Sequence, residues 1–128
     1  MSVRTDLRAY VLTIAPYAAL VGTRLYWRKL PEGVTYPAST YTIISRNGEQ
    51  AHDTPVNVPT YRVQFDHFSE DDAEVESLAT TLRQGLDGAR SGNLQSVYLD
   101  NELDDDEFDT QEGLYRIIQD FLVVYKES

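Results

Sequence analysis

The segment Leu114–Tyr125 constrains the fold more than any other part of the sequence, because its alternate positions are apolar on both sides. One face of a strand here would carry Tyr115, Ile117, Phe121, Val123 and Tyr125. The other face would carry Leu114, Ile118, Leu122 and Val124. A strand of this kind is usually central in a sheet that is covered on both faces. With few helices available in the chain, we expect a neighbouring subunit to supply the second cover, which indicates an oligomer.

Four further segments have the composition of strands: Arg24–Leu30, Thr40–Arg46, Thr60–Phe68 and Gln95–Asp100. In Thr60–Phe68, apolar and polar residues alternate, and Thr40–Arg46 is rich in β-branched residues. These two segments are expected to pair as an antiparallel hairpin. Their connection, Asn47–Pro59, is too long for a tight turn and is expected to be an exposed loop.

Two segments have the periodicity of amphipathic helices. Val3, Leu7, Tyr10, Val11 and Ile14 mark the first, which should end before Pro16, with a short second turn over Tyr17–Val21 closed by Gly22. The second helix has a stripe made of Val75, Leu78, Ala79, Leu82 and Leu86. Ser69 is its predicted N-cap, with Asp72 completing a capping box, and Gly88 marks its end.

The order helix, three strands, helix, two strands predicts an α+β fold, with an antiparallel or mixed sheet of about five strands and two main helices on one face. At 128 residues, 41% of them hydrophobic, the chain is expected to form one domain over residues 1–128. The absence of Cys excludes disulfides and thiolate chemistry. Charges at Arg4, Asp6 and Arg8 argue against a signal peptide or membrane span, so we expect synthesis in the cytoplasm.

The chain carries 21 acidic and 11 basic residues, a formal charge of −10. This charge repels phosphate backbones and anionic membranes, so stable binding to either is not expected. An acidic surface is also suited to letting DNA slide past without sticking. Simple solubility explains the same composition.

Asp66, His67 and Ser69 are the one group that resembles a catalytic arrangement. In a strand, Asp66 and His67 point to opposite faces, and no nucleophile elbow or oxyanion turn accompanies them. We therefore predict no catalytic residues. His67 is then interpreted as a surface or interface residue, and Ser69 as a helix cap.

The acidic run comprises Asp104, Asp105, Asp106, Glu107 and Asp109. It lacks the glycine turn and the terminal acidic ligand of a calcium-binding loop, and the two histidines, His52 and His67, do not have zinc-site spacing. No phosphate-binding loop is present either. We predict no metal and no cofactor, and interpret the run either as a solvated hairpin loop between the last two strands or as a patch that faces DNA or a charged partner.

Basic and aromatic residues are interleaved in only one segment, at Tyr26, Trp27 and Arg28, with Arg24 and Lys29 beside them. In an acidic chain this pattern favours a contact between subunits over nucleic-acid binding. The final strand, with its two apolar faces, is the second expected subunit contact. The candidate interface residues are Tyr26, Trp27 and Arg28 from the first segment and Tyr115, Ile117 and Phe121 from the final strand.

Several segments, taken together in order, resemble the tail-completion family of long-tailed phages and gene transfer agents, which is similar in role to tail terminators. They are Leu7–Tyr10, Ala19–Tyr26, Leu30–Gly33, Tyr36–Ala38, Arg62–Asp66, Ala73–Leu86, Gly113–Arg116, Asp120–Phe121 and Val124–Tyr125. The likeness covers almost the whole chain. The Asn47–Pro59 loop and the acidic run are not part of it.

The resemblance implies a virion protein of the tail or neck that is structural and not an enzyme. Its copies would form a ring of six that ends the tail tube, contacts the tube protein and the head connector or stopper, and lets DNA pass through its centre. The alternative hypothesis is an acidic monomeric module that binds or inhibits a basic protein. Oligomeric state separates the two.

Overall fold

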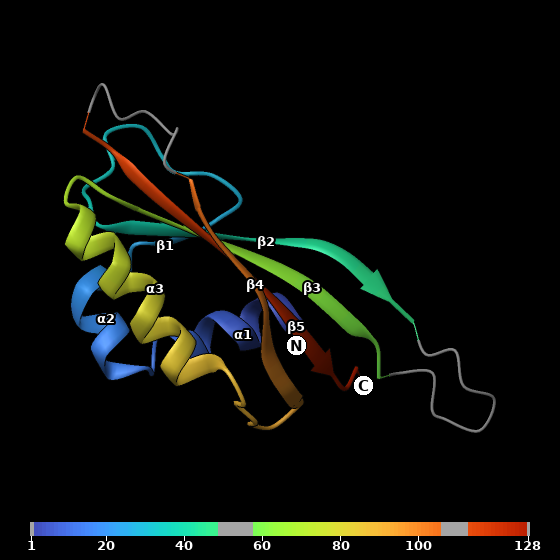
Figure 1. Cartoon of the computed structure of the whole chain (residues 1–128). Helices are drawn as coiled ribbons and strands as arrows, with labels where there is room; N and C mark the ends of the chain where they lie inside the picture. Colours follow the sequence, from blue (N-terminus) through green and yellow to red (C-terminus); the bar gives the residue numbers. More distant parts are fainter. Residues whose placement is uncertain (1, 49–57, 106–112, 128) are drawn as a thin grey trace.

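The computed structural model describes residues 2–48, 58–105 and 113–127, which form a sheet with helices on one face (Figure 1). The helices are α1 (Val3–Val11), α2 (Ala15–Val21) and α3 (Asp72–Leu86). The strands are β1 (Leu25–Trp27), β2 (Ala38–Asn47), β3 (Thr60–Ser69), β4 (Leu94–Asp105) and β5 (Tyr115–Tyr125). The order in the sheet is β1-β2-β3-β5-β4, with β1 parallel to β2 and all other pairs antiparallel. The predicted α+β fold with a mixed sheet is confirmed.

The helix ends follow from local sequence. The Ser2 hydroxyl accepts a hydrogen bond from the Thr5 backbone amide at the start of α1. Pro16 lies in the first turn of α2, and Gly22 ends that helix with a φ of 61°, a conformation that glycine adopts without strain. The predicted short turn is thus a third helix of 7 residues.

The start of α3 corrects one prediction. Asp71 is the N-cap, and its carboxylate accepts a hydrogen bond from the Ala73 amide at 3.1 Å. Ser69 instead belongs to the end of β3, where its hydroxyl accepts from the Asp71 amide and donates to Glu74. Asp71 is one of several acidic residues at the start of this helix, so the sequence pattern alone did not identify it as the N-cap.

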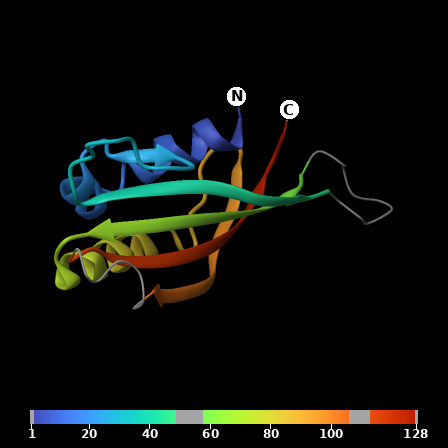
Figure 2. The same ribbon diagram turned by 90° about the horizontal axis from the view of Figure 1, so that it is seen from above.

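The predicted hairpin of β2 and β3 is confirmed, with Tyr41 opposite Phe65 and a register shift between Ile43 and Ser45. Its far end extends beyond the helices (Figures 1 and 2). Most of the predicted Asn47–Pro59 loop lies outside the described residues. Two strands differ from their predicted bounds by more than two residues at one end: β1 ends at Trp27 because Arg28 turns the chain with a φ of 73°, and β4 continues to Asp105.

One core lies between the sheet and the helices and runs from Val3 in α1 to Tyr125 in β5. Phe65 and Phe121, on neighbouring strands, pack edge to face at its centre with ring centroids 5.7 Å apart. The stripe predicted for α3 is buried: Leu78, Leu82 and Leu86 belong to this core, and Val75 and Ala79 pack with Ile117 in a second cluster. Helix α2 contacts α3 where Ile14 meets Gly85.

We predict that Gly85→Ala destabilises the protein by about 1–3 kcal/mol, although alanine is the better helix former. A Cβ at position 85 would lie 2.4 Å from Cγ2 of Ile14, a branched side chain held in the core. Urea unfolding measures the loss. The double variant Gly85→Ala/Ile14→Ala should tolerate the new methyl group. Gly85→Ala should therefore lower the free energy of unfolding less in the Ile14→Ala background than in wild type. An equal loss of free energy in both backgrounds would contradict the clash.

Candidate assembly surfaces

The sheet face opposite the helices is open and partly apolar. Along β3, Arg62, Gln64 and Asp66 alternate with buried Tyr61 and Val63 and therefore point to this open face. Their partners on β5 are Leu122, Asp120 and Ile118, and the next strand adds Tyr98 beside Leu122 and Leu103 beside Ile118. Tyr98 is 45% exposed and Leu103 is 54% exposed. No helix among the described residues covers these side chains (Figure 2).

Two ion-pair groups cross the open face. The Arg116 guanidinium lies 2.6 Å from the Asp66 carboxylate and 3.4 Å from that of Asp105. Arg62 bridges Asp100 at 2.7 Å and Asp120 at 3.7 Å. Burial raises the pKa of Asp120. These pairs link β3, β5 and β4, and because two arginines face four carboxylates, both arginines are neutralised in place while the face keeps negative charge.

The structure corrects two of the predicted interface residues. Phe121 is fully buried and Ile117 is 5% exposed, because this side of β5 faces the helices. Tyr115 is partly buried and packs beside Val75 and Ala79. The apolar residues on the outward side of β5 are instead Ile118, Leu122 and Val124, which are partly exposed.

The other three predicted interface residues lie at the β1 edge of the sheet. Trp27 is partly buried and packs edge to face on Tyr41, while Arg28 is exposed beside it. Tyr26 is half-buried on the opposite side of the strand. Arg8 donates to the carbonyl oxygens of Leu25 and Thr23, which satisfies part of the outer edge of β1.

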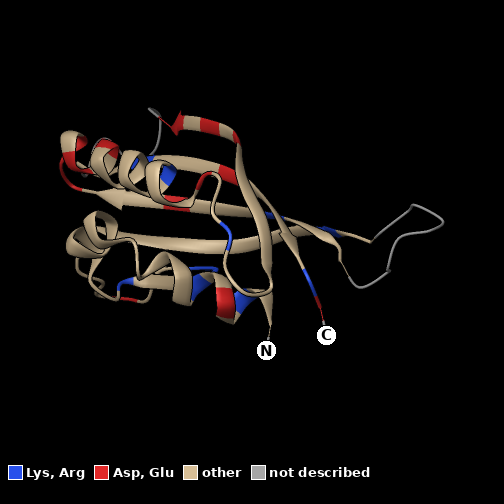
Figure 3. Cartoon of the chain, turned by 90° about the horizontal axis from the view of Figure 1, so that it is seen from below, with Lys and Arg blue, Asp and Glu red and all other residues tan. Residues whose placement is uncertain are grey.

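The acidic run begins at the opposite edge of the sheet, on β4. Asp104 is exposed and Asp105 pairs with Arg116, whereas Asp106, Glu107 and Asp109 lie outside the described residues. Figure 3 shows acidic residues at the start of α3 and the end of β4, with basic residues over α1 and β1. The chain is therefore electrically asymmetric across its sheet.

His67 is fully buried, which corrects its interpretation as a surface or interface residue. The Ser39 hydroxyl lies 2.7 Å from its Nδ1, and Nε2 lies 2.8 Å from Oε1 of Gln119. The Gln119 amide nitrogen donates to the Ala79 carbonyl and to Glu102, so Oε1 must accept from Nε2–H of His67. Burial lowers the pKa of His67 to about 4, so near pH 7 the ring is neutral with its proton on Nε2.

This network is structural in its geometry. Asp66 points to the other face of β3, as the strand alternation predicted, and forms an ion pair with Arg116 at 2.6 Å. Both ring nitrogens of His67 are occupied by partners in the core, and no opening leads to them among the surface hollows lined by described residues. Asp66, His67 and Ser69 are therefore not brought together around a substrate.

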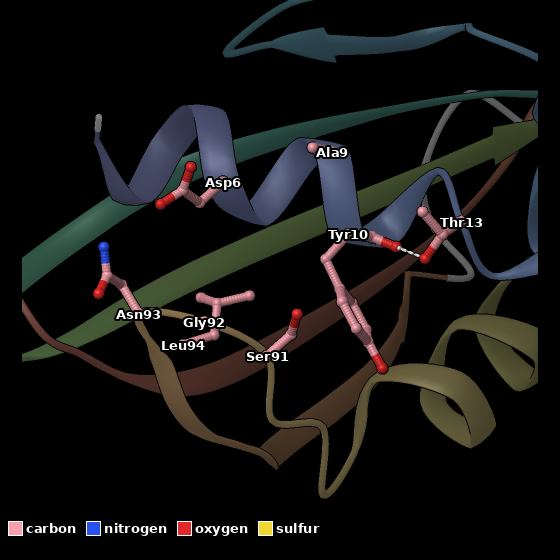
Figure 4. A pocket seen from close by; sticks show the side chains of 8 residues that line it. All are labelled: Asp6, Ala9, Tyr10, Thr13, Ser91, Gly92, Asn93 and Leu94. Carbon is pink, nitrogen blue, oxygen red and sulfur yellow. Dashed lines mark hydrogen bonds between the residues drawn. The ribbon is translucent and has the colours of Figure 1, made fainter.

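A shallow groove of about 490 Å³ lies between α1 and the turn before β4 (Figure 4). Its carboxylate, Asp6, accepts a hydrogen bond from the Tyr125 hydroxyl. Burial, followed by this bond, raises the pKa of Tyr125 to about 12. Tyr10 reaches across toward Ser91, and the Thr13 hydroxyl donates to the Tyr10 carbonyl. The hydrogen bond of Asp6 thus goes to Tyr125 and that of the Thr13 hydroxyl to a backbone carbonyl, so these two groups are bonded to structural partners and not to each other.

Among the described residues, no three His, Asp or Glu side chains gather in an arrangement that would hold a metal ion. None of the helices in this part of the chain has the length and apolar character needed to cross a bilayer.

Comparison with known proteins supplies the family. The model of the family described as tail completion protein gp17 matches residues 5–126. The chain belongs to this family. As a tail completion family member it is a structural protein of the tail or neck of a phage or phage-like virion.

A solved structure supports the fold of this tail completion chain. A chain in the virion of a native gene transfer agent particle is 18% identical, with a TM-score of 0.65, and the match covers 94% of this chain and 95% of that one. No curated protein matches the sequence. The resemblance inferred from the sequence is confirmed.

Sequence reasoning missed Gln119 and Glu102 as parts of the buried network. A signal was present: Gln119 is the one polar residue on the otherwise apolar side of β5. A buried amide on such a face requires partners, and the register that places Phe65 and Phe121 near it also brings His67 within reach.

We predict that His67 makes stability fall as the pH drops from about 6.5 to about 4. In this window the unfolded chain binds a proton at position 67 that the folded chain does not, so protonation favours unfolding. The effect amounts to roughly 3 kcal/mol over the window. His67→Gln retains one donor and one acceptor but does not titrate. Urea unfolding at several pH values should show a shallower dependence for the variant, and parallel curves would contradict the assignment.

Proposed function

We propose that this tail completion protein acts as a ring that ends the tail tube and joins it to the head connector. The observation that carries the proposal is the open sheet face, where Tyr98, Leu103, Ile118, Leu122 and Val124 have no cover among the described residues. Apolar side chains gathered on one face favour contact with another protein. Membership of the tail completion family makes subunits of the particle the natural partners.

In this proposal the chain is one domain over residues 1–128, and six copies surround a channel through which DNA passes. The formal charge of −10 suits such a channel, because an acidic lining does not retain the phosphate backbone. Asp104 and Asp105, with the rest of the acidic run, either line the channel or face a partner. Neither role requires specific DNA binding.

The proposed partners are the tail tube protein on one side of the ring and the head connector or stopper protein on the other. The open sheet face and the far end of the β2–β3 hairpin are the surfaces offered for these contacts. At that end, Arg46 forms an ion pair with Glu127 at 2.6 Å and lies over the Tyr61 ring, which ties the hairpin to the end of β5. The role is architectural, without catalysis.

The direct test is the mass of the purified protein by light scattering over a range of concentrations, with and without isolated tail tubes. A ring alone, or a monomer that becomes a ring on tubes, supports the proposal. A strict monomer that does not bind tubes would favour an acidic binding module instead.

We predict that Tyr98→Lys/Leu103→Lys leaves the fold intact but weakens binding to tubes or ring formation at least about tenfold, because desolvating two charges opposes contact. Both side chains are largely exposed, so the free energy of unfolding should change by only about 0.5 kcal/mol. The matched control Ala19→Lys/Gln84→Lys adds the same charge at exposed helix positions. Co-sedimentation with tubes and light scattering measure the effect; equal assembly of both variants would remove the open face from the interface.

A further inference from the structure

The cations around α1 and β1 have no carboxylate partner within the part of the chain that the structure describes. Across all described residues, the arginines that form ion pairs are Arg46, Arg62, Arg83 and Arg116. The cations on the α1 and β1 side are Arg4, Arg8, Arg24, Arg28 and Lys29. Arg8 and Arg24 donate to backbone carbonyls, which orients their guanidinium groups without neutralising their charge. This side of the molecule therefore carries uncompensated positive charge.

Two of these cations are arranged around an aromatic ring. The guanidinium carbon of Arg4 lies 4.2 Å from the centroid of the Trp27 ring, and that of Arg28 lies 5.1 Å from it. Both arginines are exposed, whereas Trp27 is partly buried. Tryptophan and arginine are the residues that most often dominate protein interfaces. The arginine stack formed by Arg4, Trp27 and Arg28 is thus a preformed contact surface.

The opposite edge of the sheet carries the complementary charge. Glu76 on α3 and Asp104 on β4 are exposed and form no ion pair with any described residue. They line a hollow of about 320 Å³ together with Glu102, Arg83, Ala79, Thr80 and Ile117. Glu102 is held in place by Arg83 and by the amide of Gln119. We call the side chains of Glu76, Glu102 and Asp104 the acidic hollow.

The strand register places the two surfaces at the same level of the sheet. Trp27 pairs with Tyr41, Tyr41 with Phe65, and Phe65 with Gln119. Gln119 in turn pairs with Glu102. One cross-strand row therefore runs from the arginine stack to the acidic hollow. Copies joined through these two surfaces need little displacement along the strands, which favours a closed ring over an open filament.

We propose that copies of this chain join head to tail, with the arginine stack of one copy seated in the acidic hollow of the next. The inference rests on the proposed ring and identifies its subunit contact. It assigns Asp104 to a partner-facing role and not to the channel lining. The contact is heterologous, because each copy contributes a different edge of its sheet. The occupant is a second copy, since each surface carries the charge that the other lacks.

Cysteine crosslinking tests the contact directly, because the chain has no Cys of its own. The variant Lys29→Cys/Thr80→Cys keeps every charge of the arginine stack and of the acidic hollow, because Lys29 lies beside Arg28 and the uncharged Thr80 lines the hollow. Within one chain the two positions belong to opposite edges of the sheet, at least about three strand spacings, roughly 14 Å, apart, which is beyond the roughly 7 Å limit of a disulfide. Oxidation should therefore link neighbouring copies into a ladder on a denaturing gel, ending in a closed ring. Each single-cysteine variant is the control and should give no ladder. Rings that form but give no ladder in the double variant would overturn the contact.

Charge reversal provides an independent test. Arg4→Glu/Arg28→Glu makes both edges acidic, and Glu76→Arg/Asp104→Arg makes both edges basic; Glu102 is left alone because Gln119 and Arg83 depend on it. Each variant alone should assemble at least about tenfold less well than wild type, by light scattering with and without tail tubes. An equimolar mixture should recover rings in which the variants alternate. The control Arg90→Glu/Lys126→Glu makes the same charge change elsewhere on the surface and should assemble like wild type.

The salt dependence of assembly is a third test of the contact. Assembly of wild type should weaken from 0.1 M to 1 M salt, as the screening length falls from about 10 Å to about 3 Å. Rings of both reversed variants, or a mixture that recovers nothing, would overturn this contact and leave the proposed ring intact. A wild-type chain that is monomeric with and without tubes would overturn both.

Discussion

The position of β5 is the constraint on which the rest of the structure depends. It lies between β3 and β4, antiparallel to both, so all of its backbone groups can pair within the sheet. One of its faces anchors the core through Phe121 and Val123, while the other presents Ile118 and Leu122 outward. A strand apolar on both sides needs two covers, and the helices supply one. In the proposed ring, contact with another protein of the particle supplies the second cover.

A buried polar network complements that apolar arrangement. Ser39, His67 and Gln119 connect β2, β3 and β5, and Glu102 carries the connection to the edge strand β4. The polar atoms of this network have their hydrogen-bond partners only in the observed strand register, so a shift by one residue would bury unpaired polar groups. The same network holds Glu102 in the acidic hollow. Core specificity and surface charge at this edge are thus physically linked.

Part of the candidate surface could be anticipated from particular residues. The interleaving of Tyr26, Trp27 and Arg28 indicated a contact surface, and the structure places them at the β1 edge of the sheet, with Arg28 exposed and the other two partly buried; their contact with another subunit stays a prediction. The assignment failed for Ile117 and Phe121 because both faces of β5 are apolar, and alternation then shows which residues share a face but not which face the helices cover. His67 was misassigned because its partner Gln119 is 52 positions away in the sequence.

By itself, the sequence determined the order of helices and strands, the β2–β3 pairing, the α+β class and the family. These depend on local periodicity, turn residues and the order of short segments, which a linear pattern contains. Only the tertiary structure decided which side of β5 is buried, that Asp71 and not Ser69 caps α3, and that the arginine stack and the acidic hollow lie at opposite ends of one row. The physical reason is that strand order and register bring together residues that are distant in the sequence, and neither can be read from local sequence patterns.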